Sequence, residues 1–190
     1  KPWFKAAIVF NVLSSAGAFT LAYLMANKIV DQHLYLASVY FFLHFQYNGW
    51  FIFACFGLLL SYLGRSLPEK RMYVAFLLMA AACIPAYLLS VLWIDLPVWL
   101  YLVTVAAAAV QCVSWGLIFP NIYVLVKNKT LPFIKPVLYV FGLSAIAFSA
   151  KLLLQLGSVV PSLSKLAFGF RPIVIGYLHL VLLGVVSLFV

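Results

Sequence analysis

The chain is made of long apolar stretches that are separated by short segments rich in basic residues and prolines. A helix of about twenty apolar residues is long enough to cross the hydrocarbon core of a bilayer. A soluble domain carries charge on roughly a quarter of its residues, whereas 8% of this chain is charged and 67% is hydrophobic. A surface of this composition suits lipid rather than water. The sequence therefore predicts an integral membrane protein whose first partner is the lipid bilayer.

Lipid leaves few architectures open to such a chain. The bilayer core offers no water to backbone groups, so only α-helices and closed β-barrels can span it. Barrel strands would alternate apolar and polar residues over about ten positions, and the apolar stretches here run without that alternation. We therefore expect an all-α bundle of about six transmembrane helices that forms one domain. The chain begins at Lys1 and stops at Val190 inside an apolar run, so we expect it to be part of a longer polytopic chain.

The charged and proline-containing gaps define the expected spans. Pro85 and Pro120 fall inside apolar stretches and are expected to kink them. The segment 157–171 is apolar enough to lie in the membrane interface. The six spans are expected at residues 3–26, 34–63, 72–93, 98–126, 136–156 and 172–190.

Basic residues lie mostly between the spans, and their distribution predicts the orientation. Cytoplasmic loops of membrane proteins carry an excess of Lys and Arg. One side of the expected bundle holds eight basic residues and the other holds three. We therefore expect the amino terminus to be cytoplasmic and the protein to lie in a bacterial inner membrane. The net charge of +9 is then a sign of topology, and nucleic acid is not an expected partner.

Three histidines are the polar residues that most suggest a site. Ionisable residues within spans are costly and often functional. His44 in the second span and His179 in the sixth fall at similar depths, roughly 10–15 Å from the outer side at about 1.5 Å per residue. Two imidazoles at one depth could ligate a haem iron or another metal. His33 lies eleven residues before His44, close to three helical turns, and is a candidate third metal ligand.

Two cations could assist such a cofactor. Lys151 falls near the outer end of the fifth span, and Arg171 lies just before the sixth. Haem propionates are anionic and pair with Arg or Lys, so both residues are candidate cofactor-binding residues. For Lys151 the alternative is that its long side chain reaches back to the lipid headgroups.

The second span also carries a family resemblance. The residues His44-Phe45-Gln46-Tyr47 resemble the His-Phe-His-Tyr motif of haem–copper oxidase and nitric oxide reductase large subunits. The resemblance implies that His44 is a haem ligand on a helix that runs from outside to inside. Tyr177-Leu178-His179, followed by Gly184, is similar to a second inward-running helix with an early histidine. Gln46 stands where the family has the motif's second histidine, so full oxidase or reductase chemistry is not implied.

A second function stays open beside the haem- or metal-binding one. The chain could be a non-catalytic small-solute transporter or a structural subunit that packs against other membrane subunits. In that case polar residues of the second span, such as Gln46 and Asn48, would form hydrogen bonds between helices. A zinc hydrolase is disfavoured because it requires a carboxylate base at depth. The acidic residues all fall in loops: Asp31, Glu69 and Asp95.

Overall fold

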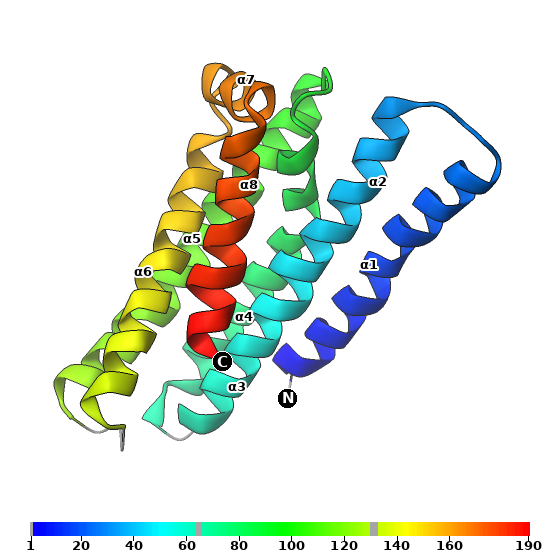
Figure 1. Ribbon diagram of the computed structural model, residues 1–190. Coiled ribbons are helices and arrows are strands. Elements are labelled where there is room, and N and C mark those ends of the chain that lie inside the picture. The colour runs from blue at the N-terminus through cyan, green and yellow to red at the C-terminus, as the bar shows by residue number, and fades with distance from the viewer. Residues whose placement is uncertain (1, 64–65, 130–132) are drawn as a thin grey trace.

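The computed structural model describes residues 2–63, 66–129 and 133–190, and in these ranges the chain is built of helices and loops (Figure 1). Four helices are long and apolar enough to cross a membrane, and two bent helix pairs would each make a further span. The expected all-α bundle is therefore confirmed. The length and composition of its helices are those of a membrane protein.

The first two spans form a hairpin. Helix α1 (Pro2–Ala26) is followed by one continuous rod that contains α2 (Gln32–His44), the π-helical segment η1 (Phe45–Phe51) and α3 (Ile52–Leu63). Asp31 begins this rod because its carboxylate accepts hydrogen bonds from the amides of His33 and Leu34, at 2.9 and 3.0 Å. A side chain that caps in this way satisfies amides that have no partner within the helix.

The middle spans are one bent pair and one long helix. Helix α4 (Glu69–Cys83) ends before Pro85, and the 3-10 segment η3 (Pro85–Val91) continues at 43° to it. This break occurs because proline has no backbone N–H and its ring obstructs the preceding helical turn. Helix α5 (Val98–Lys127) continues through Pro120. The kink expected at Pro85 is thus present, and Pro120 lies within α5.

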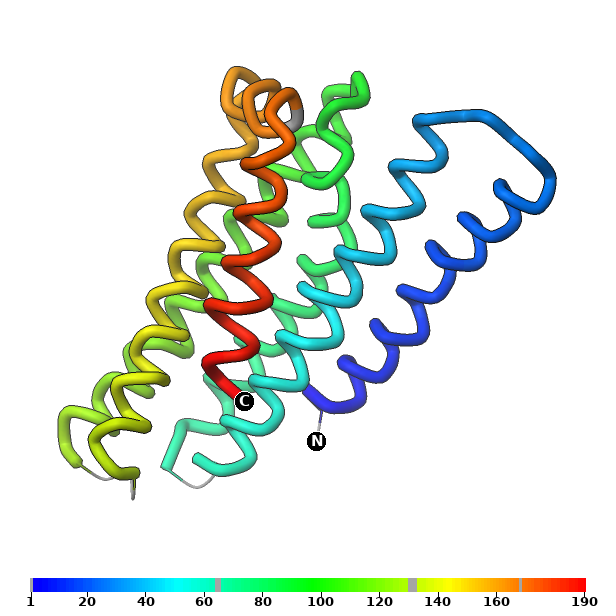
Figure 2. Tube along the Cα trace, viewed as in Figure 1, coloured from blue at the N-terminus to red at the C-terminus, as the bar shows by residue number. Residues whose placement is uncertain are grey.

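The last part of the chain returns through the bundle. Helix α6 (Lys135–Gly157) is followed by the short helix α7 (Pro161–Gly169), which occupies most of the expected interfacial segment. Helix α8 (Arg171–His179) then runs into the π-helical segment η4 (Leu180–Ser187). Figures 1 and 2 show this last rod between α6 and the α2–η1–α3 rod, with α4 and α5 behind. The sixth span therefore packs next to the second.

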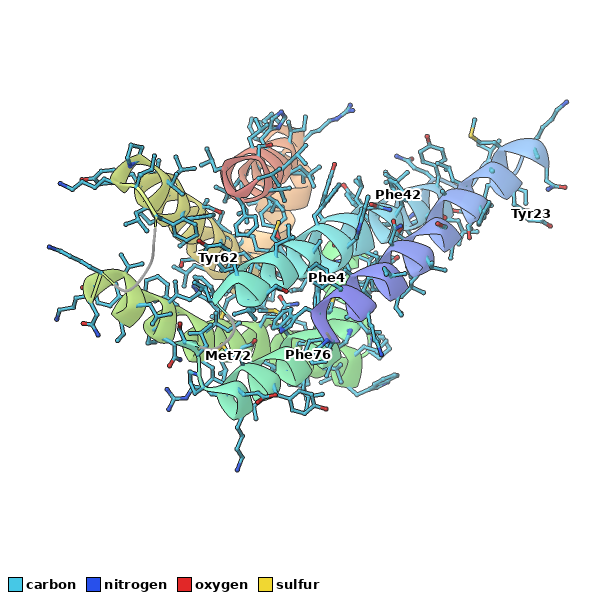
Figure 3. All side chains as sticks on the ribbon, turned by 90° about the horizontal axis from the view of Figure 1, so that it is seen from below. Phe4, Tyr23, Phe42, Tyr62, Met72 and Phe76 are labelled. Atoms are coloured by element: carbon cyan, nitrogen blue, oxygen red, sulfur yellow. The ribbon has the colours of Figure 1, made fainter. Side chains whose placement is uncertain are left out.

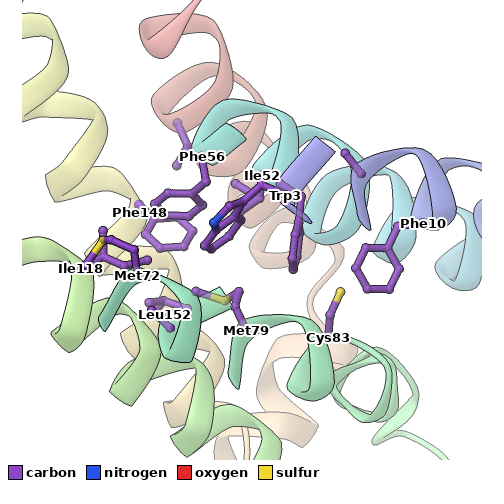
Figure 4. Close-up of a cluster of buried hydrophobic side chains, with 14 of the residues drawn as sticks. Trp3, Phe10, Ile52, Phe56, Met72, Met79, Cys83, Ile118, Phe148 and Leu152 are labelled. Atoms are coloured by element: carbon purple, nitrogen blue, oxygen red, sulfur yellow. The ribbon is translucent and has the colours of Figure 1, made fainter. Parts of the chain in front are cut away.

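The core is aromatic, and the periphery is apolar as well. Trp3 packs against Phe53, Phe56 and Phe76, with ring centroids 5.1–5.3 Å apart. Figure 4 shows Trp3 and Phe56 among other buried side chains of the core, including Met79 and Leu152. Figure 3 shows side chains that project outward around the whole bundle. Many of the exposed ones are large and hydrophobic, for example Phe19, Val98, Tyr139 and Leu153. Such a periphery suits contact with lipid chains.

Candidate functional site

His44 lies inside the bundle, at the junction of α2 and η1. Its side chain is 3% exposed, and its Nε2 lies 2.9 Å from the carbonyl oxygen of Cys83 on α4. In a continuous α-helix that carbonyl would accept from the amide of Tyr87. The break at Pro85 changes the pattern, and the Tyr87 amide donates to the Ile84 carbonyl instead, at 3.2 Å. The Cys83 carbonyl is thereby open to a hydrogen bond from another helix.

The hydrogen bond between His44 and Cys83 determines how the side chain of Asn48, four residues further along the second span, is oriented. A carbonyl only accepts, so His44 Nε2 must carry the proton that it donates to Cys83. In a neutral imidazole the other nitrogen is then an acceptor. Asn48 Nδ2 lies 3.3 Å from His44 Nδ1 and donates to it. The Asn48 Oδ1 therefore points elsewhere, and it is buried with no hydrogen-bond partner in the described part of the chain.

A cavity of about 510 Å³ lies between the second span and the end of the chain. One wall is His44 and its neighbours on α2 and η1, and the opposite wall belongs to α7, α8 and η4. The end of α6 and the segment η3 complete it. Most of the lining is aliphatic, and the polar side chains among the lining residues are Tyr40, His44, Tyr47, Asn48, Ser90, Gln155, Ser158 and Tyr177.

His179 is not among the described residues that line this cavity. Its side chain is exposed, and its Nδ1 lies 2.8 Å from the carbonyl oxygen of Ile175 in its own helix. His33 is exposed at the start of α2, where its ring lies 5.2 Å from that of Trp93. The three histidines predicted as ligands thus occupy three different surroundings.

The two cations predicted to bind a cofactor, Lys151 and Arg171, differ in their burial. Lys151 is 2% exposed within α6, and its Nζ lies 5.6 Å from the centre of the Phe148 ring. Arg171 is exposed at the start of α8. Lys151 is thus buried inside the bundle rather than exposed at its periphery.

The structure does not bring His44 and His179 to one common cavity. Both nitrogens of His44 already have hydrogen-bond partners, and His179 lies outside the cavity lining. The described residues contain no group of three or more His, Cys, Asp or Glu side chains that could hold a metal ion. The ligand roles of His44, His179 and His33 stay predictions.

Two glutamines, Gln46 and Gln155, are placed by the structure at a contact between helices and at the cavity. Gln46 Nε2 donates to Asn11 Oδ1 at 3.1 Å and to Ser14 Oγ at 2.6 Å, both on α1, which is the bond between helices that the alternative function expects. Gln155 is 6% exposed, lines the cavity, and has an Oε1 with no hydrogen-bond partner among the described residues. The sequence predicted no role for Gln155, although an amide inside an apolar span was the available signal.

Comparison with known proteins adds no assignment to this geometry. The chain matches no family model, no curated protein and no solved structure.

Proposed function

We propose that the protein is a non-catalytic membrane carrier that binds a small, mainly apolar molecule in the cavity between its second and sixth spans. The observation that carries the proposal is the cavity itself. Its volume of about 510 Å³ lies within the range of about 300–1,000 Å³ that is typical of small-molecule sites. Such sites combine an apolar lining with a few polar groups that orient the ligand, and this lining has that composition.

The cavity is also placed where an apolar molecule could enter from lipid. It lies among segments of the bundle that carry exposed apolar side chains, including Leu153 and Leu154 on α6 and Ile173 on α8. A molecule dissolved in the bilayer would reach it without crossing water. In keeping with the distribution of basic residues, we place the chain in a bacterial inner membrane with a cytoplasmic amino terminus.

A haem or metal is the competing occupant, because His44 does line this cavity. To bind iron, the imidazole would have to give up its hydrogen bond to Cys83 or to Asn48. An absorption spectrum of the purified protein, oxidised and then reduced with dithionite, decides between these occupants. A Soret band that is lost in His44→Ala would replace the carrier proposal with a haem protein.

The carrier proposal is tested by filling the cavity. Gly176 on α8 lines it, and a Cβ added there meets no atom within 4 Å, so Gly176→Phe should occupy the space without distorting the helix. Gly116→Phe is the matched control, because Gly116 also has open space around it but does not line the cavity among the described residues.

Both variants and the wild type would be purified in lipid nanodiscs, and bound small molecules would be identified by mass spectrometry after extraction. We expect an apolar molecule that copurifies with the wild type and with Gly116→Phe and is depleted at least about tenfold in Gly176→Phe. Equal recovery from all three proteins would overturn the proposal.

A further inference from the structure

We propose that a second cavity, between α3, α5, α6 and η4, holds an acyl chain of an anionic phospholipid whose headgroup is bound by Lys127 and Lys135. No described residue lines both this cavity and the one assigned to the carrier function, so the lipid site does not depend on the proposed function. Three features support it: the apolar lining, the length of the cavity and the charges at its end.

The second cavity has a volume of about 310 Å³ and an apolar, strongly aromatic lining. Two of its polar side chains are already hydrogen bonded within the bundle. The Ser144 hydroxyl donates to the Val185 carbonyl at 3.0 Å, and Trp115 Nε1 donates to Ser149 Oγ at 2.9 Å. Such a lining suits a hydrocarbon chain, which needs no hydrogen-bond partner.

The cavity opens at the periphery of the bundle. Its floor includes the buried rings of Phe56 and Phe148, whereas Tyr123 and Ile146, which also line it, are 57% and 67% exposed. Side chains that both line the cavity and are exposed mark its mouth. Because the periphery is apolar and suits lipid chains, an acyl chain reaches the cavity sideways from the bilayer.

The length of the cavity matches an acyl chain of one leaflet. On α5 the lining residues Trp115, Phe119, Ile122 and Val126 follow the spacing of one helix face. Trp115 and Val126 are eleven residues apart, which is roughly 16 Å along the helix at 1.5 Å per residue. The hydrocarbon core is about 30 Å thick, so each leaflet contributes about 15 Å of acyl chain.

Two exposed lysines flank the end of this cavity. Lys127 follows the lining residue Tyr123 by four positions on α5, and Lys135 precedes the lining residue Leu138 by three on α6. Residues three or four apart share a helix face, so each lysine lies on the face that borders the cavity. The two helix ends lie together at the end of the bundle where the chain begins (Figure 1). The chain between them contains a third lysine, Lys129, and no acidic residue.

These charges favour an anionic headgroup. The acidic residues belong to other places: Asp31 precedes α2, Glu69 begins α4, and Asp95 lies before the opposite end of α5. A lysine beside an anionic lipid surface contributes about 1 kcal/mol. A zwitterionic headgroup carries its own cation, which the lysines repel. Phosphatidylglycerol is therefore the probe, and phosphatidylcholine with the same acyl chains is its control.

The experiment places the protein in nanodiscs that contain the two lipids in equal amounts, and native mass spectrometry after release identifies the lipid that stays bound. We expect the wild type to retain phosphatidylglycerol about tenfold over phosphatidylcholine. Glycerophosphoglycerol has the headgroup without acyl chains and should not displace the lipid. Equal retention of the two lipids, no retained lipid, or displacement by glycerophosphoglycerol would each overturn the proposal.

A pair of charge variants locates the headgroup. Lys127→Gln combined with Lys135→Gln should abolish the preference for phosphatidylglycerol. Lys5→Gln combined with Lys70→Gln is the matched control and should keep it, because these lysines are also exposed and lie near the starts of α1 and α4, at the same end of the bundle (Figure 1). If both double variants lose the preference equally, the lysines act only through the overall charge of this side, and the site is wrong.

A pair of glycine variants locates the acyl chain, and it decides the question even if a charge variant fails to fold. Gly142 lines the second cavity, and a Cβ added there meets no atom within 4 Å, so Gly142→Phe should fill the cavity and lose the retained lipid. Gly116 has the same open space but lines neither cavity among the described residues, so Gly116→Phe should retain the lipid. Undiminished retention by Gly142→Phe would overturn the proposal.

Discussion

The α1–α2 hairpin depends on a backbone contact at Gly17, and this contact yields a quantitative prediction. A Cβ added to Gly17 would lie 2.6 Å from the Ser38 carbonyl oxygen and 2.7 Å from the Phe42 amide nitrogen. Both distances fall well inside the 3.4 Å at which ordinary van der Waals contact begins. Since both atoms belong to the backbone of α2, no side-chain rotation can relieve the overlap. The two helices must move apart.

The cost follows from what this movement disrupts. Overpacking of a close contact typically destabilises a protein by about 1–3 kcal/mol, whereas alanine in place of glycine within an unobstructed helix gains about 0.5–1 kcal/mol. Gly17→Ala should therefore lower the free energy of unfolding by about 1–3 kcal/mol. Gly142→Ala is the control, because a Cβ at Gly142 of α6 meets no atom within 4 Å, and it should raise the same quantity slightly.

The assay is reversible unfolding by SDS in mixed micelles, followed by circular dichroism. We expect the unfolding free energies of the two variants to differ by about 1.5–4 kcal/mol. Since about 1.4 kcal/mol corresponds to a factor of ten, the equilibrium constants should differ more than tenfold. If Gly17→Ala is as stable as Gly142→Ala, the close approach of α1 and α2 is wrong.

Three further substitutions test the packing by the same unfolding measurement. Trp3→Ala removes the ring at the centre of the aromatic cluster and should lower the unfolding free energy by about 3–5 kcal/mol. A loss below about 1 kcal/mol would place Trp3 outside the core. Ser114→Ala removes the 2.7 Å bond from its hydroxyl to the Ala75 carbonyl and should cost about 0.6 kcal/mol, at most about 1.7; an unchanged stability would contradict that bond. Asp31→Ala removes the cap of α2 and should lower the unfolding free energy by about 0.5–2 kcal/mol. Asp95→Ala is the control, because Asp95 is exposed and does not cap α5, and it should have no effect. Equal losses in the two variants would refute the capping role.

The spans were the part of this fold that could be predicted from the sequence. The expected fourth and fifth spans, 98–126 and 136–156, differ from α5 and α6 by single residues at their ends. This agreement has a physical cause: the number of residues needed to cross a bilayer is a local property of each stretch. The break at Pro85 was equally local, because one residue removes the hydrogen bond.

Which side of each helix is buried in the bundle could not be predicted in the same way. In a soluble bundle the buried side of a helix is more apolar than the exposed side, but in lipid both sides are apolar. His44 and His179 therefore looked equivalent in sequence, although one is buried and the other exposed. The partner of His44 was also hidden, because the Cys83 carbonyl becomes accessible through the change of hydrogen bonding around Pro85.

The π-helical segment η1 sets the rotational phase of the second span. In η1 the hydrogen bonds reach five residues back, as from the Ile52 amide to the Tyr47 carbonyl, so this stretch holds more residues than an α-helix of equal length. Each residue of an α-helix turns the chain by about 100°. Deletion of one residue within η1 would rotate α2 by about that angle relative to α3. Gly49 packs against Phe10 on α1, and His44 reaches Cys83 on α4. The extra residue thus allows one helix to meet two different neighbours along its length.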